Sequence, residues 1–368
     1  MKKKTLATAA ALLFAGTAHA ATFVYVSNAE DGDISQFTLE KDGSLKGGAR
    51  FKAGPVVMPM SVSPDKRYLA AAARAKPFTV YSYSIDRKSG ALKQIGTAAL
   101  AESLPYIFHD RTGKFLLGAS YPGHLVSVNP IGSNGKVGDP SQVIKTALNA
   151  HSIVTDRTNK YAFVPHLGSD QIFLFTFDAG RGKLAANTPP VLQMSKGSGP
   201  RHIIISADNK FAYLLNELTA MVTTLSLDAK TGTLKEESSA SALPPEVKLH
   251  PGAPRPTPNR DVSQDIWASD LHLTPNGKFL YAAERTSSTI GAFSVDAGTG
   301  KLTFLFSTPT EKQPRGFRID PAGRFMVVSG EKSDTVSTYA ISEDGGLKRI
   351  GQYPIGKGAN WVEIVSFD

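Results

Sequence analysis

The chain has 368 residues, of which 41% are hydrophobic and 20% are charged, and it contains 33 Gly, 23 Pro and no Cys. This composition excludes a disordered chain, and the lack of Cys excludes disulfides, thiol nucleophiles and Cys-ligated zinc. The formal net charge is +9, but Lys and Arg are scattered beyond the first residues, so the sequence predicts no nucleic-acid partner.

The first twenty residues have the features of a secretory signal peptide. Three lysines precede an apolar run from Thr5 to Gly16, and Ala18-His19-Ala20 fits the small-x-small rule for cleavage. We expect residues 1–20 to be removed on export, which takes three lysines and lowers the formal charge from +9 to +6. The mature protein is then predicted to be periplasmic. No later apolar run reaches about 18 residues, so no membrane insertion is expected.

A repeated segment runs through the mature chain: a β-rich run, an Asp/Asn/Gly-type turn, a basic residue, an aromatic residue and a second β-rich run. The aromatic residues are Phe23, Tyr68, Phe115, Tyr161, Phe211, Phe279 and Phe325. A glycine two residues before an apolar residue follows each of them and suits a hairpin turn that needs positive φ. These glycines are Gly43, Gly90, Gly135, Gly182, Gly232, Gly300 and Gly345.

Each copy holds about four short strands in roughly 46 residues, which is the period of a propeller blade. Seven copies predict an all-β, seven-bladed β-propeller that occupies residues 21–368 as one domain, although the length alone suggests two. The first copy lacks its leading strand, which the segment Asn360–Val365 can supply. We therefore expect both chain ends to share one blade and close the ring. A tandem of small β-sandwiches does not explain this interlock.

The interval between the fifth and sixth aromatic residues is longer than the others and indicates an insertion at about residues 238–264. This segment contains six prolines and is long for a loop in a compact domain. Two interpretations stay open, namely a lid over a functional site and a disordered surface loop.

Comparison of the copies locates a candidate site. The start of the innermost strand and the end of the second strand of each blade lie on one rim of the central channel. These positions hold His151, Arg201, Glu217, Arg285 and Arg315. A single arginine there is ordinarily a solvated loop residue, but several convergent polar groups on a rigid scaffold are typical of a ligand site.

The residue types limit the chemistry. His151 and Glu217 are candidate proton carriers, and Arg201 and Arg285 can hold an anionic group or stabilise a developing oxyanion. The sequence has no G-x-S-x-G, H-E-x-x-H or P-loop motif, and its histidines are dispersed. The pattern favours acid–base chemistry or hydrolysis of a small anionic or polyhydroxylated substrate, with no cofactor and no metal.

Six segments resemble the lactonases with a seven-bladed β-propeller, which include bacterial 6-phosphogluconolactonases and are related to fungal carboxymuconate lactonising enzymes. The segments are Gly199–His202, Leu215–Leu218, Trp267–Pro275, Ala283–Thr286, Gln313–Phe317 and Asn360–Val362. The resemblance covers essentially the whole mature chain and implies hydrolysis of a sugar lactone without an obligatory metal. It also implies that His151, Glu217, Arg201 and Arg285 form the catalytic group.

The same resemblance places substrate-binding residues in the cleft, with Trp361 offering a face for stacking on a sugar. These residues are His202, Asn216, Asp270, Arg315 and Trp361. The expected partner is a small sugar lactone, either 6-phosphogluconolactone or glucono-δ-lactone. The family members of the pentose phosphate route work in the cytosol, whereas an exported protein would meet gluconolactone from periplasmic glucose oxidation.

Two other hypotheses use the same site. One is a lactonising or cycloisomerising enzyme that acts on a muconate-like diacid, and the other is a non-catalytic, ligand-binding propeller of the cell envelope. The residues do not decide whether Glu217 or His151 is the base, and they do not indicate an oligomeric state.

Overall fold

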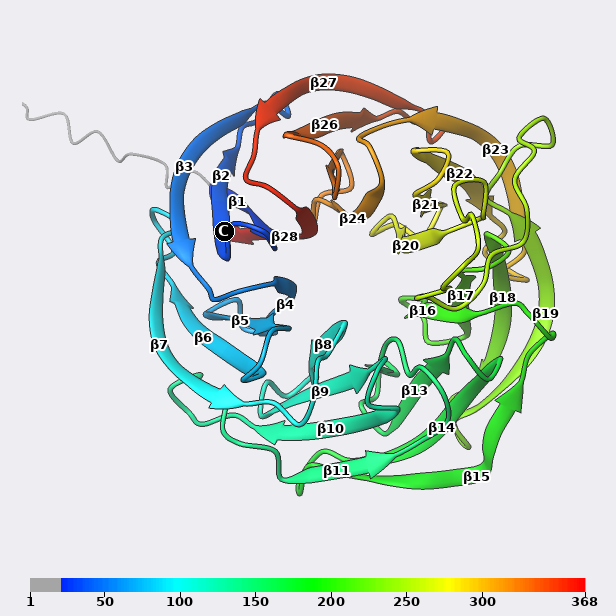
Figure 1. The fold of residues 1–368 in the computed structure, drawn as a ribbon, viewed down its shortest axis with the longest axis horizontal. Helices are drawn as coiled ribbons and strands as arrows, with labels where there is room; N and C mark the ends of the chain where they lie inside the picture. Colours follow the sequence, from blue (N-terminus) through cyan, green and yellow to red (C-terminus); the bar gives the residue numbers. More distant parts are fainter. Residues whose placement is uncertain (1–20, 368) are drawn as a thin grey trace, which may run out of the picture.

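The computed structural model describes residues 21–367, which form 28 β-strands in seven antiparallel four-stranded sheets. Figure 1 shows the sheets as the blades of a ring, through which the chain passes in sequence order. The structure confirms the predicted all-β, seven-bladed propeller. The expected signal peptide, residues 1–20, lies outside the described residues. Within residues 21–367, no helix is long and apolar enough to cross a membrane.

The blades are numbered here in chain order, and the strands of each are given from the innermost to the outermost. Blade 1 consists of β28 (Ala359–Phe367), β1 (Ala21–Asn28), β2 (Asp33–Leu39) and β3 (Leu45–Lys52). Blade 2 consists of β4 (Val57–Val62), β5 (Tyr68–Ala73), β6 (Thr79–Ile85) and β7 (Leu92–Ala99). Blade 3 consists of β8 (Tyr106–His109), β9 (Phe115–Ser120), β10 (Leu125–Pro130) and β11 (Gln142–Lys145).

The remaining four blades follow the same order. Blade 4 consists of β12 (Val154–Thr155), β13 (Tyr161–His166), β14 (Gln171–Asp178) and β15 (Lys183–Gln193). Blade 5 consists of β16 (Pro200–Ile205), β17 (Phe211–Asn216), β18 (Met221–Asp228) and β19 (Thr233–Ser241). Blade 6 consists of β20 (Ala268–Leu273), β21 (Phe279–Glu284), β22 (Thr289–Val295) and β23 (Leu302–Pro309). Blade 7 consists of β24 (Pro314–Ile319), β25 (Phe325–Gly330), β26 (Thr335–Ile341) and β27 (Leu347–Pro354).

The two ends of the chain share blade 1. Strand β28 pairs antiparallel with β1, from Ala21 opposite Phe367 to Asn28 opposite Ala359. In Figure 1 the red C-terminal strand lies beside the blue N-terminal strand. The last strand of the chain therefore supplies the innermost strand that the first copy lacks, as the sequence predicts.

The repeated aromatic residue of one blade meets the repeated glycine of the next. Each glycine has a φ between 65° and 85°, and a Cβ added to it would overlap the aromatic ring. Only glycine satisfies both the turn and the close approach of the ring. The seven pairs are Phe23–Gly90, Tyr68–Gly135, Phe115–Gly182, Tyr161–Gly232, Phe211–Gly300, Phe279–Gly345 and Phe325–Gly43.

Apolar side chains fill the space between neighbouring blades. The described residues form seven buried clusters, one at each interface. The cluster between blades 1 and 2 includes Phe23, Tyr25, Met60, Leu69 and Tyr83. Full burial of one such side chain contributes about 1.5–3 kcal/mol. Packing therefore holds the ring together and fixes the points at which the inner strands begin.

The insertion connects β19 to β20. Its strand-free part covers residues 242–267, and the expected start at residue 238 lies within β19. The backbone N–H of Gly252 donates to the carbonyl of Leu218 at 2.8 Å, and an ion pair of 2.6 Å joins Arg260 to Asp265. The first contact holds the insertion against the rim of blade 5, and the second joins two parts of the insertion to each other.

Candidate active site

A pocket of about 210 Å³ opens on the rim where the innermost strands begin. Its residues are Arg74, Pro105, Tyr121, His151, Glu217, Arg255, Trp267, Arg285 and Arg315. Seven of the nine occupy the repeat positions that the sequence places on one rim, in blades 2 to 7. The other two, Arg255 and Trp267, come from the insertion. We call this space the mouth pocket.

Glu217 lies between two guanidinium groups. Its Oε2 accepts a hydrogen bond of 2.6 Å from Nε of Arg201 and one of 3.0 Å from Nη2 of Arg285. All three side chains are buried, and charge-assisted hydrogen bonds in such surroundings are strong. Within residues 21–367, Oε1 of Glu217 has no hydrogen-bond partner. We call this arrangement of Arg201, Glu217 and Arg285 the clamp. It fixes Glu217 and leaves one carboxylate oxygen, Oε1, available.

The two arginines of the clamp remain cationic. Burial lowers the pKa of Arg201 and of Arg285, while the Glu217 carboxylate raises both. A guanidinium group keeps its proton under these conditions, because its ordinary pKa is far above neutral pH. The carboxylate thus lies between two permanent positive charges.

The mouth carries more positive than negative charge. Glu331 is 3.9 Å from Nη1 of Arg285 and 3.7 Å from Nε of Arg315. The half-buried Arg74 has no carboxylate partner within the described chain, since its Nε donates to Ser103 and its Nη1 contacts the sulfur of Met58. Five guanidinium groups therefore face two carboxylates, which leaves an excess of three positive charges. The guanidinium groups are those of Arg74, Arg201, Arg255, Arg285 and Arg315.

His151 borders the mouth pocket from blade 4. Burial, followed by the nearby Arg201, holds the pKa of His151 well below its ordinary value, so the ring is neutral. Its Nδ1 is fully buried and has no hydrogen-bond partner in the described part of the chain. Nε2 is therefore the nitrogen that water or substrate can reach. A neutral imidazole with an accessible nitrogen can accept a proton.

The insertion reaches the clamp through a stack of three side chains. The Cζ atoms of Arg255 and Arg285 lie 3.9 and 3.5 Å from the ring centroid of Trp267. Two guanidinium groups this close to one centroid would overlap if they shared a face, so they lie on opposite faces. Cation–π attraction and the 3.0 Å hydrogen bond from Nε of Arg285 to the carbonyl of Trp267 hold the stack. The insertion thus forms part of the pocket wall.

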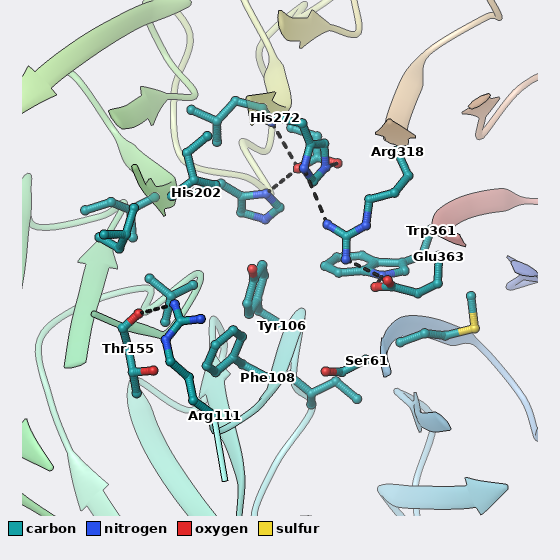
Figure 2. Close-up of a pocket in the computed structure, with 18 of the residues that line it drawn as sticks. Ser61, Tyr106, Phe108, Arg111, Thr155, His202, His272, Arg318, Trp361 and Glu363 are labelled. Carbon is teal, nitrogen blue, oxygen red and sulfur yellow. Dashed lines mark hydrogen bonds and ion pairs between the residues drawn. The ribbon is translucent and has the colours of Figure 1, made fainter. Parts of the chain in front are cut away.

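A second cavity of about 240 Å³ lies further along the channel (Figure 2). His202, Asp270 and Trp361 line it, whereas the sequence predicts them to bind substrate at the mouth. A β-bulge between Pro200 and His202 explains the position of His202. The bulge interrupts the alternation of β16, so that Arg201 and His202 are both buried and His202 lies deeper in the channel.

The other predicted residues take different places. Arg315 borders the mouth pocket, but Asn216 is held within blade 5, where its Nδ2 donates to the carbonyl of Met221 and to Oγ1 of Thr223. Arg201 lies behind Glu217 and is not among the residues that border the pocket. Residues 21–367 contain no group of three or more His, Asp or Glu side chains arranged to hold a metal ion.

Five residues that border the mouth pocket were not predicted from the sequence to belong to the site. Arg74, Pro105 and Tyr121 occupy the same repeat positions as the predicted residues, so the repeat alone could have identified them. Arg255 and Trp267 belong to the insertion, which has no counterpart in the other blades. The only indication for Trp267 was its place in a segment that carries the family resemblance.

Comparisons with known proteins agree with this fold along most of the chain. The family model for the lactonases with a 7-bladed beta-propeller matches residues 15–364. The 6-phosphogluconolactonases of Pectobacterium carotovorum and Erwinia tasmaniensis are 35% and 37% identical over 346 residues, which is 94% of this chain and 99% of each relative. A structure of the periplasmic gluconolactonase of Pseudomonas aeruginosa has a TM-score of 0.84 and 25% identity, covering 94% of this chain and 99% of the other. The chain therefore belongs to the family of lactonases with a seven-bladed β-propeller.

Proposed function

We propose that this protein is an exported hydrolase that opens a sugar lactone to the aldonic acid in the mouth pocket. The observation that carries the proposal is the clamp of Glu217 between Arg201 and Arg285, with a neutral His151 bordering the same pocket. Relatives named 6-phosphogluconolactonase and a structural neighbour named periplasmic gluconolactonase support it.

The reaction adds water to the lactone carbonyl carbon and then breaks the bond from that carbon to the ring oxygen. We assign the proton transfer to Nε2 of His151, which takes a proton from water and returns it to the departing ring oxygen. Arg285 borders the pocket and stabilises the negative charge on the carbonyl oxygen in the tetrahedral intermediate. Glu217 holds Arg285 and Arg201 in place, and its Oε1 is the other group that can accept the proton.

The charge of the mouth favours an anionic substrate. Arg74 and Arg255 have no carboxylate partner among the described residues, and both border the pocket. Guanidinium groups bind phosphate and carboxylate oxygens well, so a phosphorylated lactone gains contacts that glucono-δ-lactone lacks. An exported protein would meet glucono-δ-lactone more often, which makes a direct comparison of the two substrates informative.

A substrate panel tests the proposal. The mature protein, residues 21–368, is mixed with 6-phosphogluconolactone, glucono-δ-lactone or a carboxymuconate, and acid release or ring closure is followed against the spontaneous rate. We expect hydrolysis of at least one lactone to be accelerated. Turnover of the muconate alone would instead identify a lactonising enzyme, and no turnover of any substrate would favour the ligand-binding propeller.

Export has its own test. The protein is expressed from the full chain and recovered from the periplasmic fraction, and its N-terminus is sequenced. The proposal predicts a mature chain that begins at Ala21. An intact chain that starts at Met1 and stays in the cytosolic fraction would contradict export without affecting the proposed reaction.

A further inference from the structure

The second cavity contains a row of hydrogen-bonded side chains with Asp270 at its centre. Figure 2 shows three of the others, His202, His272 and Arg318. Oδ1 of Asp270 lies 3.0 Å from Nδ1 of His202, and Oδ2 lies 3.1 Å from Nε2 of His272. The backbone N–H groups of Leu271 and Phe317 also donate to this carboxylate, at 3.0 and 3.4 Å. Asp270 is buried, so four donors satisfy a charge that would otherwise be costly.

The tautomer of His202 follows from its two neighbours. Nη1 of Arg201 lies 3.0 Å from Nε2 of His202. A guanidinium group can only donate, so Nε2 accepts and the ring proton must be on Nδ1, where it is donated to Asp270. Burial lowers the pKa of His202 to about 3, so the ring is neutral and carries this single proton.

The same reasoning applies to His272 on the other side of Asp270. Nη1 of Arg318 lies 3.4 Å from Nδ1 of His272, so Nδ1 accepts and Nε2 donates to Asp270. Arg318 is itself fixed by Glu363, to which its Nη2 donates at 2.6 Å. Arg201 therefore donates to His202 and Arg318 donates to His272. Both histidines in turn donate to Asp270.

One side chain, that of Arg201, joins this row of hydrogen bonds to the clamp. Arg201 donates through Nε to Glu217 and through Nη1 to His202, and only 1% of the Arg201 side chain is exposed. The two bonds come from different nitrogens of one planar group, so together they fix the plane in which Arg201 holds Glu217. His202 and Asp270 border the second cavity and are absent from the wall of the mouth pocket.

We propose that His202 and Asp270 are positioning residues for the lactone hydrolysis, an inference that rests on the proposed function. They hold the guanidinium group of Arg201, which holds Glu217, and neither contacts the substrate. Asp270 fixes the tautomer of His202, and the tautomer decides whether His202 can accept from Arg201. If the proton were on Nε2, two donors would face each other across 3.0 Å.

Three variants of the two histidines separate positioning from substrate binding and from general stability. His202→Leu removes the acceptor for Arg201, and we expect kcat to fall about 100-fold with KM within threefold, as a misplacement near 1 Å can cost that much. His202→Gln keeps an acceptor and a donor and should recover most of the loss. His272→Leu removes the equivalent bond to Asp270 on the side away from Arg201 and should cost much less.

Asp270→Leu tests the tautomer directly. It removes the acceptor of the His202 Nδ1 proton, so the ring proton is no longer held on Nδ1 and can move to Nε2, where it opposes Arg201. We expect the loss in kcat to match that of His202→Leu while the folded protein persists. A rise in KM at unchanged kcat in the His202 or Asp270 variants would show that these residues bind substrate, and would overturn the proposal. Equal losses in His202→Leu and His272→Leu would also overturn it, because they would indicate general damage to the channel.

A spectroscopic readout keeps this proposal separate from the proposed reaction. The Nε–H proton of Arg201 should be protected from exchange in the nuclear magnetic resonance spectrum of the wild-type protein. The protection should be lost in His202→Leu and kept in His202→Gln, and that of Arg285 should persist in both. Unchanged protection of Arg201 in His202→Leu would refute the positioning role even in an active enzyme. If the wild-type protein hydrolyses no lactone but the protection of Arg201 depends on His202, the proposed function fails while the positioning of Arg201 by His202 stands.

Discussion

The ring of Phe325 in blade 7 lies against Gly43, the turn glycine of blade 1. A Cβ on Gly43 would overlap Phe325 and also the side chain of Ile350. The φ of Gly43 is 84°, a value that glycine adopts without strain. This contact joins the last complete blade to the blade that both chain ends share. It supplements the β28–β1 pairing, so ring closure depends on side-chain packing as well as on backbone hydrogen bonds.

We predict that Gly43→Ala lowers the free energy of unfolding by about 2–4 kcal/mol, as left-handed backbone strain adds to the overlap with Phe325. Gly197→Ala is the matched control, because Gly197 has a φ of 74° but nothing within 4 Å of an added Cβ. It should cost only the backbone strain, about 1 kcal/mol. Denaturant titration measures both, and equal losses would show that the Phe325 contact contributes nothing.

Buried histidines should make the fold sensitive to mild acid. Burial lowers the pKa of His109 and His166 to about 4 and that of His202 to about 3, and it holds the pKa of His151 well below its ordinary value. In the unfolded chain these groups titrate near 6.5. Below that pH the unfolded state binds more protons, so stability is full above about pH 6.5 and declines toward the folded pKa values.

The expected decline is about 1.4 kcal/mol per pH unit for each buried imidazole. Denaturant titrations between pH 7.5 and 5 measure it. His166→Gln is the control, since His166 does not border the mouth pocket and the variant should reduce the slope by about 1.4 kcal/mol per pH unit. A free energy of unfolding that is constant over this range would contradict the burial of these neutral rings.

Arg255 should contribute to substrate affinity through the insertion. We predict that Arg255→Ala lowers kcat/KM for 6-phosphogluconolactone about tenfold, or about 1.4 kcal/mol, since it removes one positive charge and one face of the Trp267 stack. Lys248→Ala removes a charge from an exposed position of the same insertion and should change little. Indistinguishable kinetics in the two variants would exclude a specific role for Arg255.

The proton carrier can be identified by chemical rescue. His151→Gln keeps polarity but removes proton transfer, so kcat should fall about 100-fold or more. In His151→Ala the missing side chain leaves space for a small base beside the intact clamp, so added imidazole should restore part of the rate. Full activity of His151→Gln would assign proton transfer to Oε1 of Glu217 instead.

Most of the fold could be predicted because the sequence features that define each blade are local and repeated. The aromatic residue and the turn glycine of each copy follow from short-range patterns, and their seven recurrences determine the blade count. The missing first strand and the segment Asn360–Val365 predicted the closure. The sequence did not show that the aromatic residue of one copy packs on the glycine of the next, since this contact depends on the angle between blades.

The candidate site was predictable only where it obeys the repeat. Glu217, Arg285 and His151 occupy equivalent rim positions, so ring geometry alone brings them together. The place of His202 depends on the β-bulge at Arg201, and a pattern of alternating residues does not predict a bulge. Arg255 and Trp267 depend on tertiary contacts of an insertion that has no internal counterpart.

The most direct test of the account compares the mature wild-type protein with Glu217→Gln in the initial rate of acid release from 6-phosphogluconolactone. The substitution removes the negative charge between Arg201 and Arg285 but leaves the pocket shape nearly unchanged. The account predicts hydrolysis well above the spontaneous rate in the wild-type protein and a kcat/KM at least about 100-fold lower in the variant. Equal rates for the two folded proteins would contradict it.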